Sequence, residues 1–331
     1  MDAGAPEAPP IRCAPFHEAE AADPVGSAGH YDAFLVVEVP LPWARDISMC
    51  EPFATLAGGE VLAAVVAADG RRWRPMGVVP APGSDRRRVT AYDRSVRGGG
   101  GPYRRREWTV PPSELVGLCR AVLDGTAPPA SARPEEVAAE VVDLLVCTHG
   151  RRDVCCGGAG SLLYAEVEQL CAGRPDVRVR RCSHTGGHRF APTALTFPDG
   201  FAWAHLDPAT AAAVARRGPD DAVPAGSCRG ASSVPAGAWQ AVDREGLVRW
   251  GWRWASAERE LAPLPEPADA GDAIGIEVRA QLPGEGPVVL RAVADVGRLV
   301  PTPACGAHEG DEVPTEPEWR VRDVATDVPA Q

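Results

Sequence analysis

Residues 141–188 read VVDLLVCTHGRRDVCCGGAGSLLYAEVEQLCAGRPDVRVRRCSHTGGH, and this stretch decides the fold. The apolar run 141–147 predicts a buried strand, and the spacing of apolar residues over 160–171 predicts a helix. The alternation in 177–182 predicts a second strand. A strand–helix–strand crossover makes the two strands parallel. The loops that follow them should therefore lie at the same edge of one sheet.

The chain continues as a hairpin and a helix. Residues 194–197 and 201–205 flank a Pro-Asp-Gly turn, which is typical of a hairpin. Asp207 then predicts the start of a helix that runs to about residue 215. This order predicts an α/β fold with a thioredoxin-like domain over 140–220.

The flanking regions carry weaker signals. Upstream, strands are expected at 34–40, 74–82, 87–94 and 103–110, with a helix over 111–125 that begins with Pro and ends with Gly. The run 61–68 fits either a helix or a strand. Downstream, a helix is expected at 236–248 and a hairpin at 275–280 and 288–294, and the alternating Trp250, Trp252 and Trp254 suggest an extended segment. No internal repeat is visible.

These patterns divide the chain into four parts, with the Pro-rich stretch 126–136 as the main boundary. Residues 1–32 have the composition of a flexible segment, although 13–22 could form a short helix. The other predicted parts are an N-terminal α/β region (33–130), the thioredoxin-like domain (140–220) and a C-terminal helical and β extension (221–331).

Composition narrows the class of protein. The 331 residues contain no Lys and carry a formal net charge of -11, which argues against a nucleic-acid partner. No apolar run has the length of a membrane span, and no signal-peptide pattern is visible. We therefore expect a soluble, cytoplasmic protein. Of the 10 cysteines, half lie between Cys147 and Cys182 beside histidines, a clustering that favours a metal site over disulfides.

Four side chains are candidate metal ligands: Cys147, Cys156, His184 and His188. Two thiolates and two imidazoles from converging loops suit a metal ion or an iron–sulfur centre. The start of a helix at Cys156 favours a thiolate, which would also suit a reactive thiol. Gly186 and Gly187 indicate that the two histidines lie in a loop.

The motifs CTHGRRDVCCG (147–157) and SHTGGHRFAP (183–192) resemble those of the sucrase/ferredoxin-like family. The similarity extends to PWARD (42–46) and RFAPTALTFPDG (189–200). The resemblance implies a thioredoxin-like ferredoxin whose [2Fe-2S] cluster is held by two Cys and two His. Carried over by position, the ligands are Cys147, Cys156, His184 and His188. Cys156 is preferred to Cys155 because some relatives lack a cysteine at the preceding position. No paired-carboxylate motif supports a sucrase activity.

The resemblance implies an electron carrier or redox sensor rather than an enzyme with its own substrate, with a redox donor or acceptor protein as its unidentified partner. Two neutral ligands leave the oxidised cluster uncharged, so we expect a potential above that of plant-type ferredoxins. Histidine ligation also predicts a pH-dependent midpoint potential. Arg189 lies beside the ligands and would favour the reduced state. Residues expected to surround and support the cluster are Arg151, Arg152, Asp153, Gly157, Gly186 and Gly187.

Three alternatives stay open. A structural zinc site would use the same Cys2His2 ligands. A Rieske centre would use His149, which forms a Cys-x-His pair with Cys147. A thioredoxin-like thiol oxidoreductase would use Cys155 or Cys156. Among the remaining histidines and cysteines, we expect His17, His30 and His308 to be solvated, His205, Cys171 and Cys182 to be packed, and Cys13, Cys50, Cys119, Cys228 and Cys305 to be free thiols.

Overall fold

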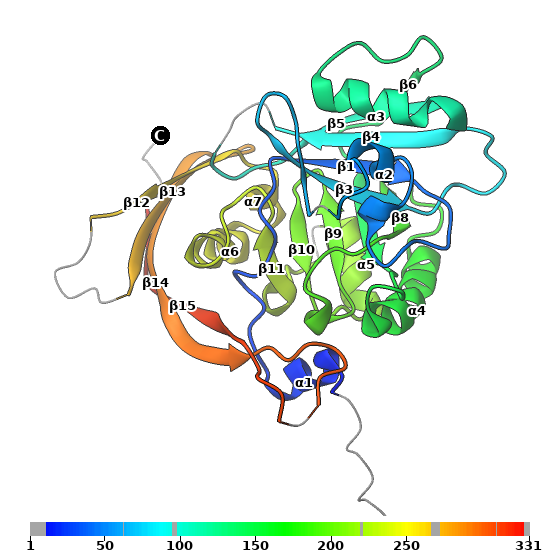
Figure 1. Ribbon diagram of the computed structural model, residues 1–331. Helices are drawn as coiled ribbons and strands as arrows, with labels where there is room; N and C mark the ends of the chain where they lie inside the picture. The colour runs from blue at the N-terminus through cyan, green and yellow to red at the C-terminus, as the bar shows by residue number, and fades with distance from the viewer. Residues whose placement is uncertain are drawn as a thin grey trace, which may run out of the picture.

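A computed structural model describes residues 11–61, 63–94, 98–218, 221–265, 272–308 and 310–327. Within these residues the chain forms a large mixed sheet of 11 strands and a separate antiparallel sheet of 4 strands (Figure 1). The strands of the large sheet follow the order β11-β10-β9-β7-β8-β3-β1-β4-β5-β6, with β2 paired to β3. The expected α/β class is therefore confirmed at the level of a mixed α/β architecture.

The stretch that decided the fold supplies two central strands of the large sheet, in the half that runs from β11 to β8. Strands β7 (Val142–Cys147) and β8 (Val177–Cys182) pair in parallel and are joined by helix α4 (Val154–Leu170). The predicted hairpin follows as β9 (Ala194–Phe197) and β10 (Phe201–Trp203), and Asp207 caps α5 (Pro208–Arg216). Helix α4 begins earlier than the expected residue 160 because the Asp153 carboxylate accepts hydrogen bonds from the N–H groups of Cys155 and Cys156.

The rest of the large sheet comes from the N-terminal half. Its elements are β1 (Ala33–Glu38), the 3₁₀ turn η1 (Ile47–Met49), α2 (Phe53–Leu56), β2 (Val65–Val66), β3 (Arg72–Val78), β4 (Arg87–Asp93), β5 (Arg104–Val110), the 3₁₀ turn η2 (Pro112–Glu114), α3 (Leu115–Asp124) and β6 (Arg133–Glu135). The ambiguous run 61–68 thus contains a short strand. Gly125 ends α3 in the left-handed conformation, as the Pro-to-Gly pattern predicted.

The two halves repeat one topology that the sequence did not show. In each half a parallel pair (β1 with β3, or β7 with β8) is followed by a strand antiparallel to its first member, a further antiparallel strand and a helix. The halves join where the C-terminal ends of β3 and β8 pair, at Val78 and Cys182. The sheet therefore continues across the expected boundary at 126–136, and the loops that follow β3 and β8 meet at the junction.

The C-terminal region forms the second sheet, from β12 (Arg259–Pro263), β13 (Ile274–Leu282), β14 (Gly286–Pro301) and β15 (Thr315–Asp327). This sheet curves around α6 (Ala238–Trp250) and α7 (Trp252–Ala255), and α6 also packs on β11 (Cys228–Ala231) (Figure 1). The expected extended segment at the three tryptophans is wrong. Trp250 ends α6 and Trp254 lies in α7, and their rings stack at 5.0 Å because the non-helical Gly251 folds the second helix back against the first.

The N-terminal segment packs against the rest of the fold from residue 11 onwards, whereas residues 1–10 of the expected flexible segment lie outside the described residues. Helix α1 (Cys13–Ala19) buries Cys13 and His17, so the expectation that His17 is solvated is wrong. The His17 ring meets Phe190 edge-on at 5.5 Å. Among the described helices, none combines the length and the apolar character needed to cross a membrane.

Candidate metal centre

Three of the four predicted ligands are in contact. Cys147 ends β7, Cys156 lies in the first turn of α4 and His184 follows β8. The Cys156 thiol and the His184 ring each form a hydrogen bond with Cys147. These interactions hold the pKa of Cys147 well below its usual range despite complete burial. A lowered pKa favours the thiolate, which is the form that binds metals.

The two neighbouring thiols shift each other's pKa in opposite directions. The hydrogen bond to Cys147 raises the pKa of Cys156, and burial raises it further. Cys156 is 1 % exposed, so its proton has little access to water. A metal ion or cluster that binds both sulfurs must displace this proton, and the anionic pair is then stabilised by the metal.

The two histidines lie next to each other, with ring centroids 6.0 Å apart. His184 Nδ1 is buried and has no hydrogen-bond partner among the described residues. His188 Nδ1 lies 2.8 Å from the Asp153 carboxylate and 3.1 Å from the Cys13 sulfur, and its side chain is 37 % exposed. An imidazole that donates one N–H to a carboxylate is oriented to bind a metal through its other nitrogen. The His188 ring is thus oriented, whereas the ligand atoms of the four predicted residues do not form a compact metal-binding group among the described residues.

His149 uses both of its ring nitrogens on backbone groups. Its Nε2 donates to the Ala44 carbonyl at 2.7 Å, and its Nδ1 accepts from the His184 N–H at 3.3 Å. Burial lowers the pKa of His149, which agrees with this neutral tautomer. Neither nitrogen is free for a metal, which argues against the Rieske alternative. The PWARD motif also has a role here: Ala44 positions His149, and His149 in turn holds the His184 backbone.

Two arginines outside the predicted site hold the histidine loop. Arg74 donates to the His184 carbonyl at 2.8 Å, and Arg229 donates to the Gly186 carbonyl at 3.0 Å. Arg229 is 2 % exposed, and in the described part of the chain no carboxylate pairs with it. Burial, together with Arg189 and Arg74, lowers its pKa to about 9. Arg229 was missed because it lies on β11, far along the chain, and belongs to no motif.

The residues expected to surround the cluster make contacts of different kinds. Asp153 binds His188, whereas Arg152 pairs with Asp46 at 2.7 Å and Arg151 is exposed. Gly186 accepts from Arg229, as described above. Gly187 has a φ of 63°, and a Cβ there would lie 2.3 Å from the Arg229 guanidinium carbon. The Arg189 guanidinium pairs with Glu316, so its charge is offset.

The glycines of α4 are required by backbone packing. A Cβ on Gly157 would lie 2.4 Å from the Gly150 Cα, and one on Gly160 would lie 1.9 Å from the Cys147 carbonyl oxygen. No atom lies within 4 Å of the equivalent position on Gly158. Gly157 and Gly160 thus let α4 cross the ligand loop.

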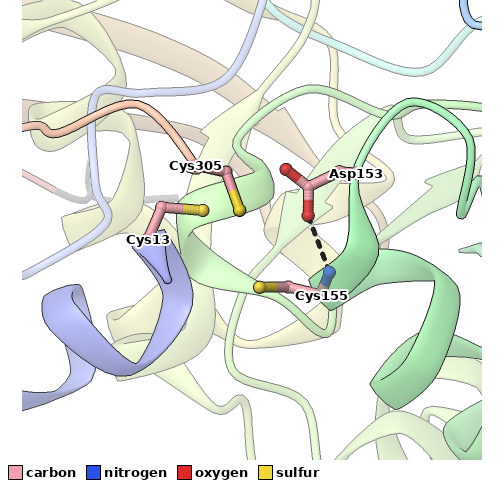
Figure 2. Close-up of side chains that lie close together, drawn as sticks. All are labelled: Cys13, Asp153, Cys155 and Cys305. Carbon is pink, nitrogen blue, oxygen red and sulfur yellow. Dashed lines mark hydrogen bonds between the residues drawn. The ribbon is translucent and has the colours of Figure 1, made fainter. Parts of the chain in front are cut away.

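A second group of possible ligands was not anticipated. The ligand atoms of Cys13, Asp153, Cys155 and Cys305 all lie within 4.8 Å of one another (Figure 2). Cys13 and Cys305 were expected to be unrelated free thiols. Their approach depends on the packing of the N-terminal segment against a C-terminal loop, for which the sequence carries no signal.

Comparison with known proteins matches the sequence model of the family "Sucrase/ferredoxin-like" to residues 24–230, more than half of the chain. The chain belongs to this family. A curated relative, "Altered inheritance of mitochondria protein 32" from Meyerozyma guilliermondii, is 36% identical over 67 residues, which are 19% of this chain and 23% of the relative. The matched segment thus covers about a quarter of that relative. No solved structure matches.

The family match covers the four predicted cluster ligands but only part of the second group of ligands. All four predicted ligands of the sucrase/ferredoxin-like protein lie inside residues 24–230, as do the PWARD motif and Arg229. Cys13 and Cys305 lie outside it. The second group of ligands therefore combines family positions with two residues that the family match does not cover.

Proposed function

We propose that this sucrase/ferredoxin-like protein transfers single electrons, or senses redox state, through a [2Fe-2S] cluster. Its ligands are Cys147, Cys156, His184 and His188, in a thioredoxin-like unit over residues 140–220. The main support is the contact between Cys147, Cys156 and His184, together with the buried and unpartnered Nδ1 of His184. An unsatisfied buried polar atom is costly unless it binds something.

When bound, the cluster supplies reversible one-electron chemistry. The protein's own residues orient the ligands and set the charge around them. Asp153 fixes the His188 ring, and His149 fixes the backbone of His184. The buried Arg229 cation favours the state with one more negative charge, because its charge is screened by neither water nor a carboxylate. This arrangement supports a raised midpoint potential.

Electrons are exchanged at the His188 edge of the site. His188 is partly exposed and lines a surface pocket together with Arg189 and Cys305. The two thiolate ligands are buried, so a partner protein reaches the site most closely at the imidazole. The partner is a redox donor or acceptor protein, and we propose a cytoplasmic location for this exchange.

Metal analysis and spectroscopy of the full chain test this function. Protein purified without oxygen should contain iron and acid-labile sulfide in equal amounts, and the dithionite-reduced form should give an electron paramagnetic resonance signal. Cys147→Ser and His184→Ala should lose iron, whereas His188→Cys should keep iron and lower the midpoint potential because it adds a negative ligand. Arg151→Gln is the matched control, since Arg151 is exposed beside the ligand loop.

The same experiment separates the remaining alternatives. A colourless protein that holds zinc at Cys147, Cys156, His184 and His188 would contradict the electron-transfer proposal. Thiol–disulfide turnover by metal-free protein would support an oxidoreductase. That activity is disfavoured by the raised pKa of Cys156 and its burial, because the attacking species must be an accessible thiolate.

A further inference from the structure

Three thiols and one carboxylate gather at the start of α4, outside the proposed iron–sulfur ligands. Figure 2 shows the sulfurs of Cys13, Cys155 and Cys305 pointing toward one another, beside the carboxylate of Asp153. All four ligand atoms lie within 4.8 Å of one another. Cys13 is buried, Cys155 is half-buried and Cys305 is exposed, so the group lies just below the surface.

The spacing suits a tetrahedral zinc ion. Zinc binds thiolate sulfur at about 2.3 Å, so two sulfurs at neighbouring corners of a tetrahedron lie about 3.8 Å apart. Atoms already within 4.8 Å of one another need to close by only about 1 Å. Thiolates select zinc over magnesium and calcium, and a carboxylate oxygen is an accepted fourth ligand.

The two remote cysteines are brought together by the backbone. Cys13 begins α1, and Cys305 lies in the loop between β14 and β15. The Ile11 N–H donates to the Ala307 carbonyl at 2.8 Å, and the Gly306 N–H donates to the Ile11 carbonyl at 2.9 Å. These hydrogen bonds place both thiols without any contribution from a metal. The site is therefore largely preorganised.

Asp153 can serve this group without leaving its other contacts. One of its oxygens caps α4 by accepting from the N–H groups of Cys155 and Cys156. The carboxylate also accepts from His188 at 2.8 Å. Each carboxylate oxygen has two lone pairs, so an oxygen that accepts one hydrogen bond can still bind a metal.

We propose that Cys13, Cys155, Cys305 and Asp153 bind a structural zinc ion. The site shares no ligand with the proposed iron–sulfur centre, and it does not depend on that centre. Zinc fastens α1 and the 305–307 loop to the start of α4. It thereby holds both segments beside His188. Cys13 and Cys305 lie outside the residues that the family model matches, so the family match does not by itself imply this site.

Metal content of four full-length proteins tests the site. The wild type should contain one zinc ion per chain in addition to iron. Cys13→Ser/Cys305→Ser should lose the zinc and keep the iron, whereas Cys147→Ser/His184→Ala should lose the iron and keep the zinc. Cys119→Ala/Cys171→Ala, which removes two buried thiols elsewhere, is the matched control and should keep both metals.

A second measurement covers the case in which the double serine variant folds poorly. Metal-free wild type is titrated with Co²⁺, and the thiolate-to-cobalt charge-transfer band is recorded before and after zinc is added. One equivalent of cobalt with thiolate absorption, displaced by zinc and unaffected in Cys147→Ser/His184→Ala, supports the proposal.

Three results would overturn it. Zinc that is lost with Cys147 and His184 belongs to the other ligand set. A wild type without zinc, whose metal-free form shows no thiolate–cobalt band, has no such site. A thiol count that finds Cys13 and Cys305 joined in a disulfide assigns the pair to redox chemistry. The iron content of the same samples reports separately on the proposed electron-transfer function.

Discussion

Alanine at position 160 tests the closest backbone approach in the candidate metal centre. The new Cβ would lie 1.9 Å from the Cys147 carbonyl oxygen and 3.1 Å from its carbonyl carbon, and both atoms are backbone. Neither can rotate away, so α4 must move off β7. Overpacking of this kind costs about 3 kcal/mol, and the gain of about 1 kcal/mol from replacing a helical glycine offsets part of it. We expect Gly160→Ala to be destabilised by about 2 kcal/mol.

Gly158→Ala is the matched control in the same helix. No atom lies within 4 Å of its new Cβ, so only the propensity gain of about 1 kcal/mol remains. Thermal unfolding followed by circular dichroism should show the two variants shifting in opposite directions. A change of 1 kcal/mol moves the Tm of a large domain by roughly 2–4 °C, so the expected fall for Gly160→Ala is about 4–8 °C. If both variants were stabilised, the inferred contact between α4 and Cys147 would be wrong.

Three further predictions concern the surroundings of the site. His149→Leu should release iron faster than His149→Gln under a chelator, because leucine supplies neither hydrogen bond that positions His184; equal rates would contradict this. Arg229→Gln should lower the midpoint potential by more than Arg151→Gln does, because Arg229 is buried and Arg151 is exposed; equal shifts in the same titration would contradict this. Asp143→Asn should lose about 3–5 kcal/mol at neutral pH because the buried Arg105 loses its carboxylate partner, whereas Arg178 keeps Glu107. Burial raises the pKa of Asp143, but its arginine partners outweigh burial and lower it. The contribution of Asp143 to stability is therefore present above the unfolded pKa near 3.9 and is lost as pH falls through the lower folded pKa. Acid unfolding that is the same in Asp143→Asn and wild type would contradict this role of Asp143.

The sequence predicted those parts of the fold that depend on neighbouring residues. The parallel pair of β7 and β8 followed from one apolar run, one alternating run and a crossover helix. The sequence also predicted the cap at Asp207 and the glycine that ends α3, because each residue acts within one turn of its own helix. Three predicted ligands meet because parallel strands bring their following loops to one edge. Whether they bind a [2Fe-2S] cluster stays a prediction.

What the sequence could not predict depends on contacts between distant segments. Trp250 and Trp254 fit an alternating strand pattern, but they lie in the separate helices α6 and α7, and α6 packs between the two sheets. Arg229 supports the histidine loop from β11, with no motif around it. Cys13 and Cys305 meet only because the N-terminal segment and a C-terminal loop exchange backbone hydrogen bonds. None of these contacts leaves a periodic or local pattern.

The repeated topology gives a physical reason for the position of the site. After the first strand of each half, an aspartate caps the next helical turn: Asp46 for η1 and Asp153 for α4. Only an Arg-Asp pair is shared by these loops, which is too little for a repeat to be seen in the sequence. The halves meet where their parallel pairs end, so the PWARD loop reaches the ligand loop, and Ala44 and Asp46 bind His149 and Arg152. The N-terminal half contributes none of the four predicted cluster ligands, yet it fixes the backbone of His184. We infer that the ligand geometry requires both halves of the sheet. In the β7–β8 unit alone, His149 and Arg152 would lose their partners in the PWARD loop and face water.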